Sequence, residues 1–189
     1  MRSLSEIETA AKRASRAVGF SWGDSEEVAK SIRQLELFGL QGIKNLNQYY
    51  KDKATKKFED LNLISKTNEA SLEAYCPIIL GISFLDQIKS IQDLKIIKFK
   101  KIAYPVLFLS FLSRASEISG KKIHIIFDKN EILLNLNVNV SLNFLNQEFP
   151  QFAEEIEVKF IENKDNFNES DWNSLYKLAE DTFWKKMRV

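Results

Sequence analysis

The chain has 189 residues, a formal net charge of +1, and a composition that is 44% hydrophobic and 12% aromatic. A chain of this length buries roughly 70% of its unfolded surface in one core, so we expect a single domain over residues 1–189. The small net charge argues against a surface that gathers nucleic acid or anionic membrane. Only three prolines and six glycines accompany 14 phenylalanines, which excludes a disordered chain.

Single copies of cysteine and histidine limit the chemistry of the chain. Cys76 cannot form an intrachain disulfide, which fits a reducing compartment. His124 cannot build a metal site of paired histidines, so we expect no metal and no cofactor. The N-terminus lacks the apolar core of a signal peptide, and the most apolar stretch, Ile102 to Leu112, is too short to span a membrane. We therefore expect a cytoplasmic protein without membrane or nucleic-acid partners.

Capping patterns and glycines predict helices at the start of the chain. Ser3-x-x-Glu6 opens a first helix that ends before Gly19, and Asp24-x-x-Glu27 opens a second that ends before Gly39. A short third helix is expected over Gly42 to Tyr50. The inward stripes of the first two helices are predicted to contain Ile7, Ala10, Ala11, Ala14 and Val18, then Val28, Ala29, Ile32 and Leu35.

The middle of the chain is predicted to contain an exposed segment, a helix and a strand. Lys51 to Asn68 is polar and weakly periodic, and we expect it to be exposed or mobile. Alternation over Asp93 to Lys101 favours a short strand. Between them Pro77 suits the first turn of a helix that runs to about Ile91. Its inward residues are expected to be Ile78, Ile79, Ile82, Leu85 and Ile88.

Tyr104 to Val140 is predicted to form the centre of the core. The helix from about Pro105 to Ser119 is apolar on nearly all sides in its first half and ends at Gly120. A β-hairpin follows, with Asp128-Lys129-Asn130 as its turn and a returning strand from Ile132 to Val140. The buried face of its first strand is expected to contain Ile123, Ile125 and Phe127.

A further strand and a last helix complete the predicted elements. Ile156, Val158 and Phe160 alternate with charged residues, and Asn168-x-x-Asp171 caps a helix. One face of that helix contains Trp172, Leu175, Tyr176, Ala179 and Phe183. Because the strands run together without regular βαβ alternation, we predict an α+β fold. In it, about five or six helices cover a small antiparallel sheet built on the hairpin.

Four stretches together resemble a known family. They read SLSEIETAAKRASRAVGFSWGDSEEVAK, CPIILGISFLDQI, KIAYPVLFLSFLSRASEISGKKIHIIFD and DWNSLYKLAEDTF. In this order they resemble an uncharacterised bacterial family, the domain of unknown function three-seven-two-six. The resemblance implies a soluble bacterial protein without an established activity, so it assigns no catalytic residue. In family members the last helix usually runs into a tail of the type YVPATEASR, whereas this sequence ends in FWKKMRV.

Two candidate binding residues lie beside predicted helix ends. Trp22, at the corner between the first two helices, could line a pocket with Phe20 and Tyr104, or serve as a packing plug. Cys76 could act as a nucleophile, because a helix N-terminus lowers the pKa of a thiol. Its alternative role is that of a small buried hydrophobic residue.

Three further candidates belong to the central helices. Arg114 follows the buried half of its helix and, with Ser110 and Ser113, could bind a carboxylate or phosphate. The alternative is an ion pair with Asp86 or Glu117. Tyr104, Asp86 and Arg114 are together the candidate residues for an enzymatic site. His124 is expected to be structural or solvent-facing. Balanced charge favours a solvated strand edge for Lys95, Lys98, Lys100 and Lys101.

Three functional hypotheses follow, and whether the protein is an enzyme stays open among them. The first is a non-catalytic domain that binds a small metabolite or a partner protein through its aromatic and arginine-bearing surface. The second is a small-molecule lyase, isomerase or hydrolase that uses Asp86, Tyr104 and Arg114. The third is a subunit of a homo-oligomer or larger assembly, with an exposed apolar face on the last helix or the hairpin.

Overall fold

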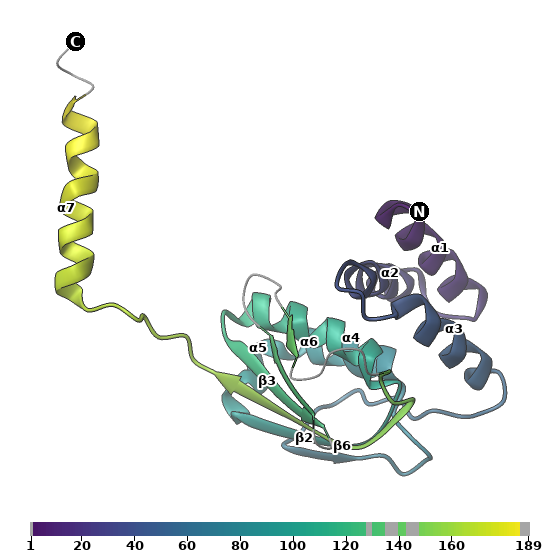
Figure 1. Ribbon diagram of the computed structural model, residues 1–189. Coiled ribbons are helices and arrows are strands. Elements are labelled where there is room, and N and C mark those ends of the chain that lie inside the picture. The colour runs from purple at the N-terminus through teal and green to yellow at the C-terminus, as the bar shows by residue number, and fades with distance from the viewer. Residues whose placement is uncertain (1, 128–129, 135–139, 143–147, 186–189) are drawn as a thin grey trace.

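The computed structural model describes residues 2–127, 130–134, 140–142 and 148–185. Its helices and strands form an α+β fold, as predicted, with one sheet and helices stacked on one of its faces (Figure 1). The hairpin turn predicted at Asp128 and Lys129 lies outside the described residues.

The first three helices begin and end at local signals. α1 spans Leu4–Ala17 and carries the predicted capping box between Ser3 and Glu6. α2 spans Trp22–Leu37 and starts earlier than predicted, because Ser21 rather than Asp24 is its cap; the Ser21 side chain accepts from the Asp24 amide at 3.0 Å. α3 spans Gly42–Lys53, where a short helix was expected.

The central helices pack closely because of one glycine. α4 (Pro77–Asp86) is followed by α5 (Ile88–Ile91) and a 3-10 turn (Gln92–Leu94), so the predicted helix to Ile91 is interrupted at Gln87. α6 spans Pro105–Ser119, as predicted, and ends at Gly120 with φ +69°. A Cβ on Gly81 would lie 2.2 Å from the Phe111 ring. Glycine therefore permits the close contact between α4 and α6.

The sheet contains six described strands in the order β1-β2-β6-β3-β4-β5. Their bounds are β1 Thr67–Glu69, β2 Ile96–Ala103, β3 Lys122–Phe127, β4 Asn130–Leu134, β5 Val140–Leu142 and β6 Phe152–Ile161. Only β1 and β2 pair in parallel. β6, the last strand in the sequence, lies between β2 and β3. β3, the first strand of the hairpin, is thus one of the two central strands, and β4 lies beside it.

The strand predicted over Ile132–Val140 is wrong in one respect. β4 and β5 pair antiparallel, with Leu134 opposite Val140, so the chain reverses between them. Alternation alone does not distinguish one long strand from two short ones, and the asparagines between the apolar residues also favour turns. Residues 135–139, which connect the two strands, lie outside the described residues.

Helices cover the sheet in two layers. α4 and α6 lie on the sheet, and α2 packs on both of them. α1 and α3 pack in turn on α2, so the first three helices form the layer farthest from the sheet (Figure 1). The other face of the sheet has no described helix against it. It presents charged side chains such as Lys98, Glu157 and Lys159.

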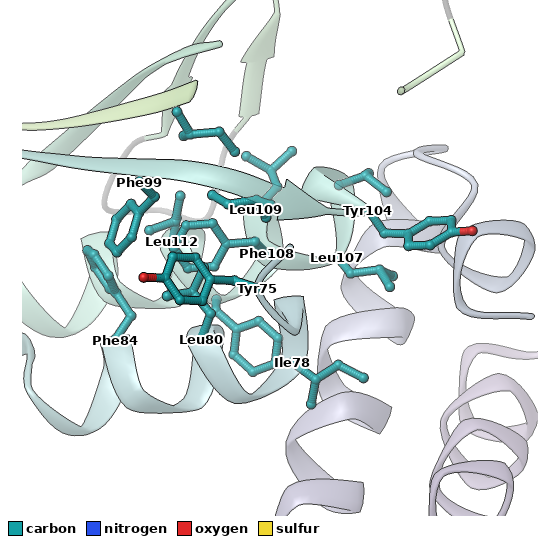
Figure 2. Close-up of a cluster of buried hydrophobic side chains, with 14 of the residues drawn as sticks. Tyr75, Ile78, Leu80, Phe84, Phe99, Tyr104, Leu107, Phe108, Leu109 and Leu112 are labelled. Carbon is teal, nitrogen blue, oxygen red and sulfur yellow. The ribbon is translucent and has the colours of Figure 1, made fainter. Parts of the chain in front are cut away.

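Aromatic residues fill the space between the sheet and its helices (Figure 2). Phe84 of α4, Phe99 of β2 and Phe108 of α6 meet with ring centroids 5.6 to 6.2 Å apart. Phe108 meets the other two rings edge-on, an arrangement that aromatic quadrupoles favour. The predicted inward set of α4 is partly wrong, because Leu80 and Phe84 are fully buried while Ile79 and Ile82 are only half-buried.

α7 (Glu169–Lys185) does not cover the sheet. It extends away from the body of the molecule on the side opposite α1, α2 and α3 (Figure 1). Trp172, Leu175 and Tyr176, expected on one helical face, are exposed. α7 is therefore not among the helices that cover the sheet. A helical stripe shows that a face needs a partner but not where that partner lies.

The polar run from Lys51 to Asn68 includes the end of α3, a loop and the start of β1. Most of its side chains are exposed, whereas Ile64 is buried. β1 was not predicted. Its backbone bonds and the side-chain amide of Asn68, which donates to Lys98 O at 3.1 Å, attach this run to the sheet.

Candidate functional site

A surface groove runs between α1, α2 and α3 and has a volume of about 520 Å³. Ile32 of α2 lies at its floor, almost fully buried. Its remaining apolar lining comes from α1 and α3: Ile7, Ala10, Ala11, Ala14, Ile43 and Leu46. The groove is therefore an apolar channel open to solvent and a candidate binding site.

Small residues on α1 create this groove. Ala10 and Ala14, one turn apart, carry only a methyl group where larger residues would fill the gap to α3. α1 and α3 both pack on α2, which holds them on either side of Ile32. Ile43 of α3 is 41% exposed although it is a large aliphatic residue. An exposed isoleucine in a concave apolar surface is the pattern of a binding site rather than of a core.

Polar groups are confined to the margin of the groove. Arg2 and Glu6 line one part of it and form an ion pair of 3.6 Å, and Asn47 lines another. Hydrogen bonds from Ser3, first of all from its backbone N–H, lower the pKa of Glu6. The margin thus carries the Arg2–Glu6 ion pair and the side-chain amide of Asn47 around an apolar floor.

Three tyrosines form a cluster on the inner side of α3. The Tyr49 ring lies 5.6 Å from Tyr50, 5.8 Å from Tyr104 and 5.3 Å from Phe58, measured between centroids. The Tyr50 hydroxyl lies 2.6 Å from Ser15 Oγ of α1, and Ser15 donates to Ala11 O. Burial raises the pKa of Tyr50 to about 12. The cluster fixes α1 and α3 beneath the groove.

Tyr104 is one of the predicted site residues. It precedes α6 with φ 46°, a left-handed conformation that is unusual for a tyrosine, and its side chain is buried. Its hydroxyl donates to Asp52 Oδ2 at 2.8 Å. Burial and the Asp52 carboxylate raise the pKa of Tyr104, and the same bond lowers the pKa of Asp52. Tyr104 therefore belongs to the cluster behind the groove.

Cys76 is the cap of α4, as the sequence places it, and it is fully buried. Its Sγ accepts from the Ile79 amide at 3.5 Å and lies 2.9 Å from the Tyr49 hydroxyl. Burial raises the pKa of Cys76, which outweighs the lowering effect of these hydrogen bonds. A buried thiol in this state is a poor nucleophile. Through Tyr49, the fold brings Cys76 into the same cluster as Tyr104.

Trp22 lies away from that cluster. It is 63% exposed and occupies the first turn of α2. Lys12 and Arg16 of α1 stack over its ring, at 5.7 and 4.7 Å from the centroid. Phe20, its expected neighbour in a pocket, is buried and contacts Tyr50. Trp22 therefore joins α1 to α2 on the surface, and the structure does not bring it together with Tyr104.

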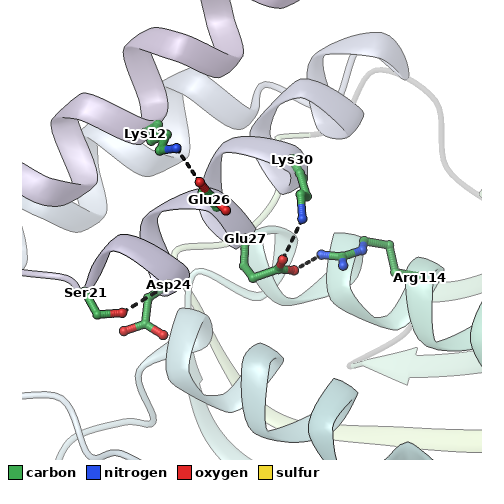
Figure 3. A network of polar contacts seen from close by, with 7 residues as sticks. All are labelled: Lys12, Ser21, Asp24, Glu26, Glu27, Lys30 and Arg114. Atoms are coloured by element: carbon green, nitrogen blue, oxygen red, sulfur yellow. Dashed lines mark hydrogen bonds and ion pairs between the residues drawn. The ribbon is translucent and has the colours of Figure 1, made fainter.

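Arg114 belongs to a network between α2 and α6 (Figure 3). It forms an ion pair with Glu27, which also accepts from Lys30 at 2.9 Å. Burial raises the pKa of Glu27, but the bonds from Lys30 and Arg114 outweigh it and leave the pKa lowered. Asp86 and Glu117 were expected as partners of Arg114, and this expectation is wrong because α2 packs on this part of α6. Glu27 is 87 residues away in the sequence, so no local pattern predicts this contact.

The other groups expected around Arg114 are occupied elsewhere. Ser113 accepts from Gln34 Nε2 at 2.9 Å, and Ser110 donates to Leu107 O at 3.1 Å. Asp86 is exposed at the end of α4. Tyr104 and Arg114 are separated along α6 by roughly 15 Å at the rise of an α-helix. These residues do not share a hydrogen-bond network among the described contacts.

The open face of the sheet carries the remaining candidates. His124 lies 3.3 Å from Glu131, between Nε2 and Oε2. Lys98 pairs with Glu155 and Glu157 at 3.3 and 3.1 Å. The lysines were expected on a strand edge, which is wrong, because β2 lies between β1 and β6. Alternating charges on this face instead neutralise one another across neighbouring strands.

The described residues also bear on metal binding and membrane insertion. Within the described ranges, no group of three or more His, Cys, Asp or Glu side chains is placed to hold a metal ion. No helix among them is long and apolar enough to cross a membrane.

The fold and groove define an α+β protein with a helical surface site. Residues 2–75 match the model of a family described as a protein of unknown function, DUF3726. This confirms the resemblance for the first of the four stretches, and the three later stretches lie outside the matched residues. No protein of curated function and no solved structure matches the chain. The matched segment contains α1, α2 and α3, and therefore the whole groove.

Sequence reasoning missed the groove itself. The stripe on α1 was predicted as a contact face, and the structure leaves Ala10 exposed on it. The available signal was the small size of the alanines together with Ile43 on the third helix. No local pattern shows that α1 and α3 stand on either side of α2.

Proposed function

We propose that this protein is a non-catalytic binding domain that takes the apolar side of a partner helix into the groove between α1 and α3. The observation that carries the proposal is the groove's lining, an apolar floor with the Arg2–Glu6 ion pair at its margin. A volume of about 520 Å³ falls in the range of ligand sites, and a groove between helices suits an amphipathic helix.

The polar residues behind the groove support binding over catalysis. The hydroxyls of Tyr49, Tyr50 and Tyr104 are each engaged with a protein partner, and the Cys76 thiol is buried. The alternative, a lyase, isomerase or hydrolase using Asp86, Tyr104 and Arg114, has less support. Two of those side chains are held in contacts with Asp52 and Glu27.

The test is a titration with the apolar dye 1-anilinonaphthalene-8-sulfonate, followed by fluorescence. Ala10→Glu places a charge in the groove, and Thr9→Glu places the same charge on the neighbouring face of α1. Both positions are exposed, so we expect changes in unfolding free energy within about 0.5 kcal/mol. We expect Ala10→Glu to weaken dye binding by about tenfold and Thr9→Glu to leave it unchanged. Equal binding by both variants contradicts the proposal.

A further inference from the structure

α7 presents a row of apolar side chains to solvent. Trp172, Leu175 and Tyr176 are 46%, 62% and 56% exposed, and Ala179 on the next turn is exposed as well. Their spacing of i, i+3, i+4 and i+7 places them on one face of the helix. An isolated helix of this length is marginally stable in water, so burial of this face against a partner would stabilise it.

The linker to α7 is fixed to the body at its start. Asn163 Nδ2 donates to Gly120 O at 3.0 Å, directly after α6, and Lys121 Nζ lies 2.8 Å from Glu162 Oε1. Residues 164–168 then reach roughly 17 Å when extended. From this point α7 points away from the sheet and from the helices that cover it (Figure 1). Its apolar face is therefore accessible to a separate molecule.

The two edges of the apolar face are acidic. Asp171 precedes Leu175 by one turn, and Glu180 follows Tyr176 by one turn. The sole cation in the sequence from residue 169 to residue 180 is Lys177, which lies on the side of the helix away from the apolar face. Two α7 helices packed together would bring like charges close to one another, which disfavours a second copy as the partner. The charges instead favour a partner whose cations flank an apolar surface.

We propose that α7 is a docking helix whose apolar face enters a groove rimmed by Lys and Arg on a partner protein. Trp172, Leu175 and Tyr176 are its anchors, because recognition of a helix in a groove uses side chains at this spacing. The acidic edges pair with the cations of the rim and set the orientation of the helix. This surface is separate from the groove between α1 and α3, and lies on the opposite side of the molecule (Figure 1).

The area of the anchors indicates a transient complex. Each of the three side chains hides on the order of 100 Å² when its exposed part is covered. With an equal area on the partner, the total is on the order of 600 Å², which is below the size of stable interfaces and suits a weak encounter. We therefore expect a partner that binds and releases α7, and not a permanent subunit.

The test uses a synthetic peptide that supplies the chemistry of such a partner. In this amphipathic peptide leucines form one helical face and lysines flank it, and a control peptide has glutamates in place of the lysines. Fluorescence anisotropy of each labelled peptide, titrated with the full chain at low ionic strength, gives its dissociation constant. The net charge of +1 does not by itself attract a cationic peptide. We expect the lysine peptide to bind at least about tenfold more tightly than the glutamate peptide.

Two pairs of matched variants locate the binding surface on α7. Leu175→Gln removes an anchor, and Ser174→Gln makes the same kind of change on the opposite side of the helix. Glu180→Lys reverses an edge charge, and Glu117→Lys makes the same change of net charge at an exposed position of α6. We expect the affinity for the lysine peptide to fall about fivefold or more with Leu175→Gln and about threefold with Glu180→Lys. Both controls should change it by less than about twofold. Circular dichroism checks that all four variants keep the helix content of the parent chain.

The outcomes separate this proposal from the proposed function. If Leu175→Gln leaves the affinity unchanged, or if the glutamate peptide binds as tightly as the lysine peptide, the docking role of α7 is overturned. Ala10→Glu tests the groove between α1 and α3 with the same peptide. If Ala10→Glu lowers the affinity and Leu175→Gln does not, the peptide occupies that groove, which supports the proposed function and contradicts docking by α7.

Discussion

The Tyr104 hydroxyl donates a hydrogen bond of 2.8 Å to Asp52 and thereby joins the start of α6 to the last turn of α3. Tyr104 has the backbone conformation φ 46°, which costs on the order of 1 kcal/mol for a residue other than glycine. The surrounding packing and this bond hold it there. The bond thus connects the central core to the helix that forms one wall of the groove.

Replacing Tyr104 with Phe should lower the free energy of unfolding by about 1–1.5 kcal/mol at neutral pH. This loss of stability lies at the lower end of the range for a hydrogen bond to a charged group. The reason is that the Asp52 carboxylate still has two partners in the variant, Lys56 Nζ at 3.2 Å and Gln48 Nε2 at 3.3 Å. Urea unfolding of both chains at neutral pH provides the measurement.

The same bond predicts a pH dependence. The pKa of Asp52 is lowered in the folded protein, so its contribution is present above the unfolded value of about 3.9 and is lost as pH falls through the folded value. The difference between the parent protein and Tyr104→Phe should therefore narrow below about pH 4. The control is the same comparison in chains that also carry Asp52→Asn. There, the difference in unfolding free energy between the chains with and without Tyr104→Phe should not narrow at low pH. A constant difference from neutral to acidic pH would show that the bond is not the source of the effect.

Cys76 should resist modification in the folded protein. Its Sγ is buried against Tyr49, and burial raises its pKa, so little thiolate is available. We expect the reaction with 5,5′-dithiobis(2-nitrobenzoic acid) to be at least about a hundredfold slower in buffer than in urea. Absorbance at the thionitrobenzoate band measures both rates. Rapid stoichiometric labelling of the native protein would refute the structural role assigned to Cys76.

Replacing Gly81 with Ala should destabilise the protein by about 2 kcal/mol or more, because the added methyl overlaps the Phe111 ring. Gly23→Ala is the matched control, since its nearest neighbour, Ser21 Oγ, lies 3.8 Å away. That substitution should be neutral or stabilising in the first turn of α2. Thermal unfolding, followed by circular dichroism, measures the stability of both variants. Adding Phe111→Leu to the Gly81→Ala chain should recover part of its lost stability. If it recovers none, the strain does not come from contact with the Phe111 ring.

The sequence by itself determined those features that depend on neighbouring residues. The Ser3–Glu6 capping box, the limits Pro105 and Ser119 of α6, and the buried face of β3 were all predicted and confirmed. Each arises from interactions within one helix turn or from the alternation of one strand. The α+β class follows from the same local patterns, because they show the order of the helices and strands.

Tertiary structure decided everything that joins distant parts of the chain. It placed β6 between β2 and β3, paired Arg114 with Glu27, and held α1 and α3 apart to form the groove. It also left Trp172, Leu175 and Tyr176 of α7 exposed, although they share one apolar face of the helix. The physical reason is that periodicity specifies which face of a helix or strand seeks an apolar partner. The identity of that partner depends on contacts between residues far apart in sequence.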